Sequence, residues 1–263
     1  MPIIKHLYFS EYGEGRATIP PVLLIHGAGS SQNIWLPKIR RLRGFRTIAL
    51  DLPGHGKSGG TACQSIDAFA REVLSFLDGL GLYHIILVGH SMGGAVALTI
   101  ALQQPDIVEA LGLISSGAAI GVPPDVLDNL SNPRTVPIAL DILKKSAFSP
   151  RTSQRIIDKT MQGLHSVRQG VLYSDWLACS RYDLRHQVNR IRTPTWVAVG
   201  SDDDLTPLSY ARYLAINIPD VHLQVVPDAG HMLILEQPDA VAFGLNQFLG
   251  KLFSETQNKF VSN

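Results

Sequence analysis

The chain of 263 residues has the length of one large domain, or of one domain that carries an insertion. Apolar residues make up 45% of it, which is enough to build a sizeable core. The formal net charge of +1 argues against a nucleic acid or another polyanion as the partner. One local basic cluster predicts a solvated helix face, or alternatively a contact for an anionic carrier or headgroup. Its members are Lys38, Arg40, Arg41, Arg43 and Arg46.

The N-terminal segment and the cysteines favour a cytoplasmic location. Residues 1–6 lack the basic and then apolar order of a secretion signal. No apolar run approaches the roughly 20 residues that span a bilayer. Cys63 and Cys179 lie far apart and outside any C-x-x-C spacing. We therefore expect two free thiols in a reducing compartment, with a bridge between them as the open alternative.

Short apolar strands alternate with amphipathic helices over the first part of the chain. A strand at Val22–Ile25 ends in His-Gly-Ala-Gly, and a second at Thr47–Leu50 ends in Asp-Leu-Pro-Gly-His-Gly. Over 66–80 the apolar residues recur at helical spacing, with Ser65 as the expected N-cap and Gly81 as the expected stop. This alternation predicts a parallel sheet covered on both faces, with ligands bound beyond the carboxyl ends of the strands.

The most informative segment is Gly89–Gly93, which has the pattern G-x-S-x-G. It follows the apolar run Ile85–Val88, which predicts a buried strand, and precedes 94–102, which predicts a helix. A serine on so sharp a turn is held in a strained backbone with its hydroxyl exposed, and the glycines avoid collisions with strand and helix. Ser91 is therefore the candidate nucleophile. The alternative is a small-residue turn that only packs the helix on the sheet.

After one more predicted strand, at 110–114, the rhythm of strands and helices stops. Prolines are dense at first, and helices are then predicted at 135–147, 152–164 and 166–180. We expect this helical insertion to lie over the sheet as a cap. The chain then divides into a first core part at 1–116, a cap at 117–190 and a second core part at 191–263.

The alternating rhythm resumes in the last third of the chain. Strands are predicted at 195–199 and 222–226, and helices near 207–217 and 238–252. The tail from Ser254 is polar, so we expect it to be frayed. Internal repeats and low-complexity tracts are absent from the sequence.

A serine hydroxyl needs a base to remove its proton, and the base needs an acid to hold its tautomer. For a nucleophile on such a turn, the expected chain order is serine, acid, histidine. His231 is the candidate base, because it follows a glycine in the loop after the last strand. The residues alone predict that one of three adjacent carboxylates is held inward, while the others cap the helix that starts near Pro207. These candidate acids are Asp202, Asp203 and Asp204.

An acyl-transfer site also needs N–H donors for the negative charge that develops on the carbonyl oxygen. The backbone N–H of Met92, at the start of the helix, is one candidate. The second donor should come from the loop after an early strand, where His26–Gly29 fits, and we choose the N–H of Ala28. The alternative for this loop is a plain glycine-rich turn.

Together these motifs resemble the α/β-hydrolase superfamily over nearly the whole chain. The resemblance rests on Gly89–Gly94, on His26-Gly27, on the run Asp-Leu-Pro-Gly-His-Gly-Lys-Ser from Asp51, and on Gly230-His231 with the Glu and Pro that follow. It implies an α/β-hydrolase fold, with a mostly parallel central sheet flanked by helices and a helical cap insertion. The insertion resembles the cap that roofs the active site in this family and sets substrate choice.

The resemblance also selects the acid. In this family the acid lies three residues after a glycine such as Gly200 and four before a proline such as Pro207, which is the position of Asp203. The implied catalytic triad is Ser91, Asp203 and His231. No metal or organic cofactor is implied.

The motif around Ser91 looks most like those of small carboxylesterases and monoacylglycerol lipases. We therefore expect a serine carboxylesterase that acts on small to medium esters through an acyl-enzyme. Haloalkane dehalogenases and epoxide hydrolases also resemble the chain, but they use aspartate as the nucleophile. Apolar cap residues are the candidates for the substrate pocket. They are Phe148, Met161, Leu164, Leu172, Trp176 and Leu177.

Two alternatives stay open at this point. The same triad could cleave a C–C bond of a diketone-type acid, whose carboxylate would need a cation such as Arg168, Arg181 or Arg185. Thioester and lactone hydrolysis belong with this alternative. The second is a weakly hydrolytic receptor that binds its ligand on the same fold. We expect a small-molecule ester as the partner and a monomer or homodimer, without nucleic acid or a membrane span.

Overall fold

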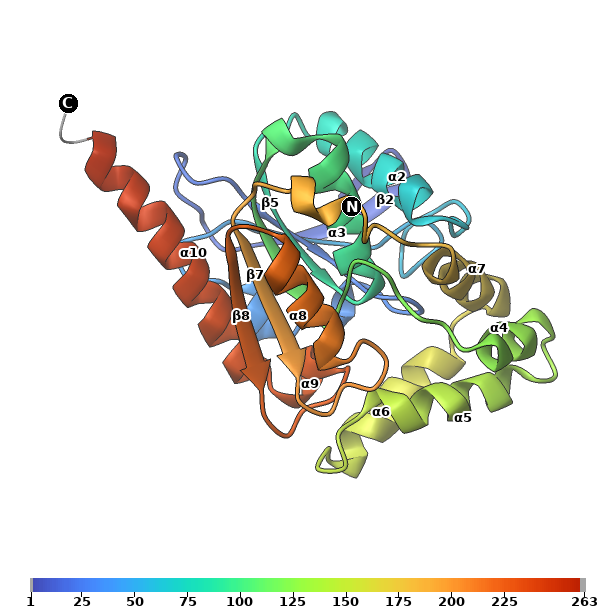
Figure 1. Cartoon of the computed structure of the whole chain (residues 1–263). Coiled ribbons are helices and arrows are strands. Elements are labelled where there is room, and N and C mark those ends of the chain that lie inside the picture. The colour runs from blue at the N-terminus through green and yellow to red at the C-terminus, as the bar shows by residue number, and fades with distance from the viewer. Residues whose placement is uncertain (1, 261–263) are drawn as a thin grey trace.

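The structure is a computed structural model that describes residues 2–260, with side chains to Ser254 (Figure 1). Within these residues the centre is one eight-stranded sheet in the order β1-β2-β4-β3-β5-β6-β7-β8. The pairs β1–β2 and β2–β4 are antiparallel, and the other neighbouring pairs run parallel. The strands are β1 (Ile3–Ile4), β2 (Leu7–Tyr12), β3 (Val22–Ile25), β4 (Thr47–Leu50), β5 (Ile85–His90), β6 (Val108–Ile114), β7 (Thr195–Gly200) and β8 (Val221–Val226).

Helices cover both faces of this sheet, as the alternating pattern predicts. The helices of the core are α1 (Pro37–Arg40), α2 (Ile66–Gly79), α3 (Met92–Gln103), α8 (Leu208–Asn217), α9 (Leu233–Glu236) and α10 (Pro238–Phe260). Along β3, Leu23 and Ile25 belong to the same core cluster as side chains of α2, α3 and α8, whereas Val22 and Leu24 belong to a second cluster with side chains of α1 and α10. Because neighbouring side chains of a strand point to opposite faces, both layers need an unbroken apolar run.

The hydrophobic core lies on the two faces of the central strands. All four residues of β3 and all four of β4 are buried, and so are all six of β5 and of β7. Full burial of one Leu or Ile side chain stabilises the fold by about 1.5–3 kcal/mol before entropy is counted. The predicted strands and the long predicted helices of the core are therefore confirmed.

Two expectations about charged and polar segments are wrong. Helix α1 has four residues, so Arg41, Arg43 and Arg46 lie outside it and the basic cluster is not one helix face. Arg46 pairs with a glutamate on β2. Helix α10 continues to Phe260 instead of ending near residue 252, and Phe253 packs on the core and against the Phe45 ring. The elements β1, α1 and α9 were not predicted, since two to four residues show no clear period. The six-residue strand β2 was missed as well.

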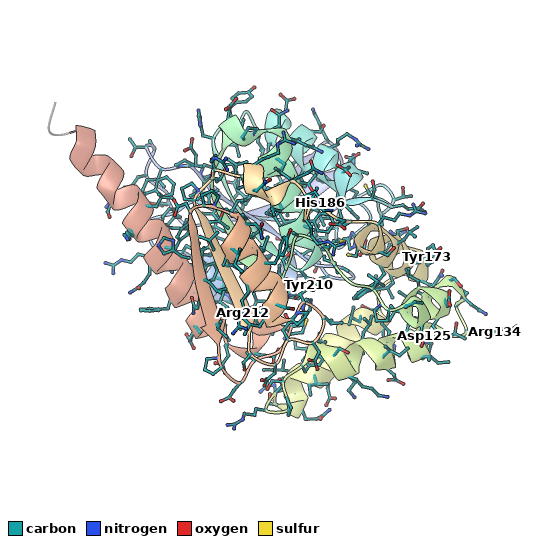
Figure 2. All side chains as sticks on the ribbon, in the orientation of Figure 1. Asp125, Arg134, Tyr173, His186, Tyr210 and Arg212 are labelled. Atoms are coloured by element: carbon teal, nitrogen blue, oxygen red, sulfur yellow. The ribbon has the colours of Figure 1, made fainter. Side chains whose placement is uncertain are left out.

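Four helices between β6 and β7 form a separate cluster, which we name the insertion helices. They are α4 (Pro124–Ser131), α5 (Val136–Ala147), α6 (Gln154–His165) and α7 (Gln169–Ser180). Figure 1 shows them grouped to one side of the sheet layers, and in Figure 2 Asp125, Arg134 and Tyr173 lie there, apart from Tyr210 and Arg212 on α8. The sequence predicted α5, α6 and α7 within a few residues. It did not predict α4, which begins in the proline-dense stretch at Pro124, a residue type that suits the first helical position.

The insertion helices have their own small core, and the chain enters and leaves them at one place. Ala119 and Asp183 form an antiparallel bridge, and the N–H of Leu184 donates to the Ala118 carbonyl at 2.7 Å. Both cysteines are free thiols, Cys63 half-buried and Cys179 buried. Over the described residues, no helix combines the length and the apolar character that crossing a membrane requires.

Candidate active site

The turn between β5 and α3 holds Ser91 in the conformation that the motif predicts. Its backbone has φ +53° and ψ −120°, a region that a residue with a side chain rarely adopts. A Cβ on Gly89 would overlap the backbone of Gly93, and a Cβ on Gly93 would overlap the backbone of Ile25. The two glycines are therefore required sterically, and the turn presents the serine hydroxyl at the carboxyl end of a central strand.

The structure brings the serine, the histidine and one of the three candidate acids together. His231 Nε2 lies 2.9 Å from Ser91 Oγ, and His231 Nδ1 lies 3.1 Å from each carboxylate oxygen of Asp203. Asp203 is 3% exposed and His231 6% exposed. The neighbouring carboxylates point elsewhere, because Asp202 accepts hydrogen bonds from Ser149 and Ser201 and Asp204 is exposed. The selection of Asp203 thus agrees with the geometry.

Asp203 is held as a carboxylate by its surroundings. It accepts the N–H groups of Leu205 at 3.0 Å and Thr206 at 2.8 Å, and the Thr206 hydroxyl at 2.8 Å. Burial by itself would raise the pKa of Asp203, but the charge and hydrogen bond of His231 and the bonds from Thr206 lower it overall. Sequence reasoning missed Thr206, whose hydroxyl three residues after the acid also lies 3.1 Å from His231 Nδ1.

A second histidine supports the backbone of the first. His90 Nε2 lies 2.9 Å from the carbonyl oxygen of His231, so it donates its proton there. Burial and then the neighbouring His231 lower the pKa of His90 to about 3, which keeps the ring neutral. Among the described atoms, His90 Nδ1 has no partner. The position of His90 behind His231 was not predicted.

The loop after β3 lies directly against the serine. A Cβ on Gly27 would lie 3.1 Å from the Cβ of Ser91. Within the described part of the chain, the N–H groups of Ala28 and Met92 donate to no protein acceptor. Both predicted donors are therefore free of competing protein hydrogen bonds beside Ser91.

The same loop is fixed from behind by His26. Its Nδ1 lies 2.8 Å from the Gly27 carbonyl, and its Nε2 accepts the N–H of Leu52 at 3.0 Å. Burial and then the nearby His55 lower the pKa of His26, so the ring stays neutral and one nitrogen accepts while the other donates. His26 thus ties the loop after β3 to the loop after β4.

A buried ion pair links the core to the insertion helices. Asp175 on α7 is fully buried, and its Oδ2 lies 2.7 Å from His55 Nε2 and accepts the N–H of Gly29 at 2.8 Å. Burial by itself would lower the pKa of His55, but the charge and hydrogen bond of Asp175 raise it overall. The other carboxylate oxygen of Asp175, Oδ1, has no partner among the described atoms. Asp175 was missed, although an acid inside the mostly apolar stretch 171–179 is a visible signal.

A cavity of about 770 Å³ opens onto Ser91 and His231, and we name it the large cavity. Loops of the core line one part of it, and α5, α6 and α7 of the insertion helices line the rest. Of the predicted pocket residues, Leu164 and Trp176 line it. The other four are not among its described lining: Phe148, Met161, Leu172 and Leu177. The first three pack in the core of the insertion helices, and Leu177 is half-buried elsewhere on α7.

Three arginines were candidates for binding a substrate carboxylate, and the structure separates them. Arg168 lines the large cavity. Arg181 lines a different cavity of about 220 Å³, beside α2 and α3, and Arg185 pairs with Asp183 on the surface. Arg181 and Arg185 are therefore wrong as candidates for that role. Within the part of the chain that the structure describes, no three His, Cys, Asp or Glu side chains are grouped so as to hold a metal ion.

Comparisons with known proteins agree with this geometry. The profile described as the alpha/beta hydrolase family matches residues 22–242. The chain is 32% identical to the dihydrolipoyllysine-residue acetyltransferase component of the acetoin cleaving system of Pseudomonas putida, over 93% of this chain and 66% of that protein. This chain therefore spans slightly less than two thirds of that longer relative.

Two further comparisons cover both partners more fully. The chain is 30% identical to 2-hydroxy-6-oxononadienedioate/2-hydroxy-6-oxononatrienedioate hydrolase of Comamonas testosteroni, over 89% of this chain and 87% of that one. The solved structure of a thermophilic esterase is 31% identical with a TM-score of 0.81, over 95% of this chain and 96% of that one. The matches thus include different hydrolytic reactions on one architecture.

Proposed function

Because the chain belongs to the alpha/beta hydrolase family, we propose that it cleaves carboxylic esters through an acyl-enzyme on Ser91. That it is a hydrolase of this superfamily follows from the family match, and the reaction class is our inference. The observation that carries the inference is the hydrogen-bonded series Ser91, His231, Asp203 at one end of the large cavity. This arrangement is the one that activates a serine hydroxyl for attack on a carbonyl.

In the proposed first half-reaction, Ser91 Oγ attacks the ester carbonyl and its proton passes to His231 Nε2. The buried Asp203 carboxylate stabilises the imidazolium that forms. The N–H groups of Ala28 and Met92 donate to the oxyanion, and one such donor is worth about 3–4 kcal/mol in the barrier. His231 then gives its proton to the leaving alcohol, which breaks the C–O bond and leaves the acyl group on Ser91.

In the second half-reaction, water attacks the acyl carbonyl, and His231 takes a proton from that water. The tetrahedral intermediate collapses, the carboxylic acid leaves and Ser91 regains its hydroxyl proton from His231. The insertion helices act as a cap, because they supply α5, α6 and α7 to the wall of the cavity that holds the substrate. A volume of about 770 Å³ suits a small to medium ester.

The test combines labelling with turnover. A fluorophosphonate should add once to the protein, at Ser91, and p-nitrophenyl esters of increasing chain length should be hydrolysed. Ser91→Ala should lose both the adduct and about a millionfold in kcat, while its thermal unfolding stays close to that of the parent. An unchanged rate in Ser91→Ala would refute the assignment.

Cleavage of a C–C bond in a diketone-type acid is the second candidate. It is supported by Arg168 in the wall of the large cavity and by the relative from Comamonas testosteroni, whose name describes a hydrolase of a dienedioate. Labelling of Ser91 without turnover of simple esters, combined with cleavage of a vinylogous diketone, would favour it over ester hydrolysis. Thioesters and lactones belong in the same substrate panel.

A further inference from the structure

The charged residues that line the large cavity are all cationic. Arg155, Lys159 and Arg168 line it, and no Asp or Glu is among its described lining. The two nearby carboxylates of the site, Asp203 and Asp175, are buried behind His231 and His55 and bonded to them. All three cations are exposed, so the cavity presents positive charge to a ligand on its solvent-facing side. This is unexpected for a chain whose net charge is only +1.

Two of these cations form a matched pair. Arg155 and Lys159 are one helical turn apart on α6, so their side chains share a face of that helix, and both line the large cavity. Among the described residues neither forms an ion pair with an acid, although Lys38, Arg46 and Arg151 elsewhere on the surface each do. Like charges at this spacing repel each other. An anion placed between them would remove that repulsion and gain charge-assisted hydrogen bonds.

The third cation has a structural partner that fixes its place. Arg168 Nη2 donates to the carbonyl of Gly54 at 3.0 Å, which ties the start of α7 to the loop after β4. Its charge stays uncompensated, because no acid pairs with it in the described part of the chain. Arg168 therefore adds a fixed positive charge to the cavity, while Arg155 and Lys159 remain available to bind.

The position of the pair relative to the nucleophile sets the shape of the ligand. Ser91 comes from the core, and Arg155 and Lys159 come from the insertion helices on another wall of the same cavity. Apolar side chains line the cavity as well, among them Leu164 and Trp176. A ligand that fills the space would have its ester at the core wall, an apolar middle and a charged end at α6.

We propose that the substrate is an acidic ester, whose carboxylate is bound by Arg155 and Lys159 at the end remote from the scissile bond. This inference rests on the proposed ester hydrolysis and deepens it by naming the substrate class. The carboxylate can belong to the acyl part, as in a half-ester of a dicarboxylic acid, or to the alcohol part. Both sources present the same chemistry to the pair on α6.

The test compares esters that differ only in charge. For the acyl side, the p-nitrophenyl half-ester of adipic acid is paired with the ester in which an amide replaces the free carboxylate. For the alcohol side, a carboxyphenyl butyrate is paired with the matching carbamoylphenyl butyrate. The parent should prefer the acid of at least one pair by roughly tenfold in kcat/KM, mostly through KM, because only the charged form gains the salt-bridged contacts. The side that shows the preference identifies the position of the carboxylate.

The variant Arg155→Gln with Lys159→Gln should lose that preference while its rate on the neutral esters stays unchanged. The matched control is Lys144→Gln with Lys145→Gln, which removes two exposed cations of α5 outside the lining of the large cavity and should keep the preference. Equal kcat/KM for acid and amide in both pairs would overturn the inference and leave ester hydrolysis standing.

A second readout separates failure of the inference from failure of the proposed function. Where no ester is turned over, adipate monoamide and its uncharged diamide are tested for slowing the fluorophosphonate labelling of Ser91. Protection by the acid alone, lost in the double variant on α6, would support the anion-binding pair without ester turnover. Equal effects of acid and diamide would overturn it.

Discussion

The sheet core and the insertion helices bury their apolar side chains to different degrees. Central positions such as Leu24 and Val88 are 0% exposed and covered on both faces of the sheet. The insertion helices also have fully buried positions such as Leu140, which is 0% exposed, but Met161 is 8% exposed and many of the surrounding apolar side chains are only half-buried. Dense packing fixes atoms closely, so the core suits groups that must hold a reaction geometry. The thinner layer of the insertion helices suits a wall that selects the ligand.

The two regions meet through polar contacts close to the reacting groups. The Asp175–His55 pair is one contact, and the hydrogen bond from Arg168 to Gly54 is another. A third runs through Glu236, whose Oε2 accepts the N–H of Ser149 at 3.1 Å and of Gly230 at 3.0 Å. The Glu that follows the histidine motif thus bonds the loop of His231 to the insertion. The proposed chemistry therefore lies where the sheet core and the insertion helices meet.

The largest expected effect is on kcat and comes from a residue of the sheet core. Asp203→Asn should lower kcat on an activated ester by about ten-thousandfold, because the amide cannot hold the His231 tautomer or stabilise its charged form. Asp202→Asn is the matched control, since its carboxylate accepts only from Ser149 and Ser201 and should leave kcat within about threefold. Steady-state rates on one ester decide the comparison, and similar losses in both variants would contradict the role of Asp203.

The environment of Asp203 also predicts how the parent behaves in acid. The pKa of Asp203 is lowered from the ordinary carboxyl value, so the group is a carboxylate at neutral pH. Protonation of Asp203 should therefore leave activity unaffected at neutral pH.

The next prediction compares how much a buried side chain in each region contributes to the stability of the fold. Leu24→Ala removes a fully buried side chain between β3 and the α1 and α10 layer, and should cost about 3–5 kcal/mol of unfolding free energy. Met161→Ala in the insertion helices should cost about 1–2 kcal/mol, because the site is 8% exposed and can collapse onto its neighbours. Denaturant unfolding measures both losses of unfolding free energy, and the slope of that free energy against denaturant concentration should stay unchanged. Equal costs would mean that the insertion is packed as tightly as the sheet.

The same difference explains how much the sequence could predict. Strands, long helices and the candidate triad were predicted because each depends on a local pattern: a period, a turn or a fixed spacing around Ser91 and His231. The fold of the core follows from these. Asp175 was missed because its partners His55 and Gly29 lie 120 and 146 residues away along the chain.

The wall of the large cavity was predicted only in part for a related reason. Leu164 and Trp176 face the cavity, whereas Met161 and Leu172 face the core of the insertion helices. All four are apolar and helical, so the choice depends on how the insertion is rotated over the sheet, which no local pattern records. Because the pocket candidates were chosen for their apolar character, the cationic lining residue Arg155 was also missed.

The last substitution breaks the link between the two regions. Asp175→Asn keeps the shape of the side chain but removes its charge beside His55, and should cost about 2 kcal/mol of unfolding free energy. The substitution should also lower kcat more than it raises KM, since the Asp175 carboxylate holds Gly29 next to the proposed donor Ala28. Asp158→Asn, on the exposed side of α6, is the control and should change neither quantity. A stability loss with unchanged kcat would make Asp175 a structural group only.

The pH dependence of this variant gives a sharper measurement. The pKa of His55 is raised in the folded protein, so its ion pair stabilises fully below about pH 6.5, the ordinary histidine value, and the gain is lost as pH rises through the folded pKa. Asp51 also faces the ring with a negative charge, and His26 lies beside it with its centroid at 4.9 Å. The difference in thermal midpoint between the parent and Asp175→Asn should therefore shrink as pH rises above about 6.5. A difference that stays constant to alkaline pH would mean that His55 is neutral and that the link is an uncharged hydrogen bond.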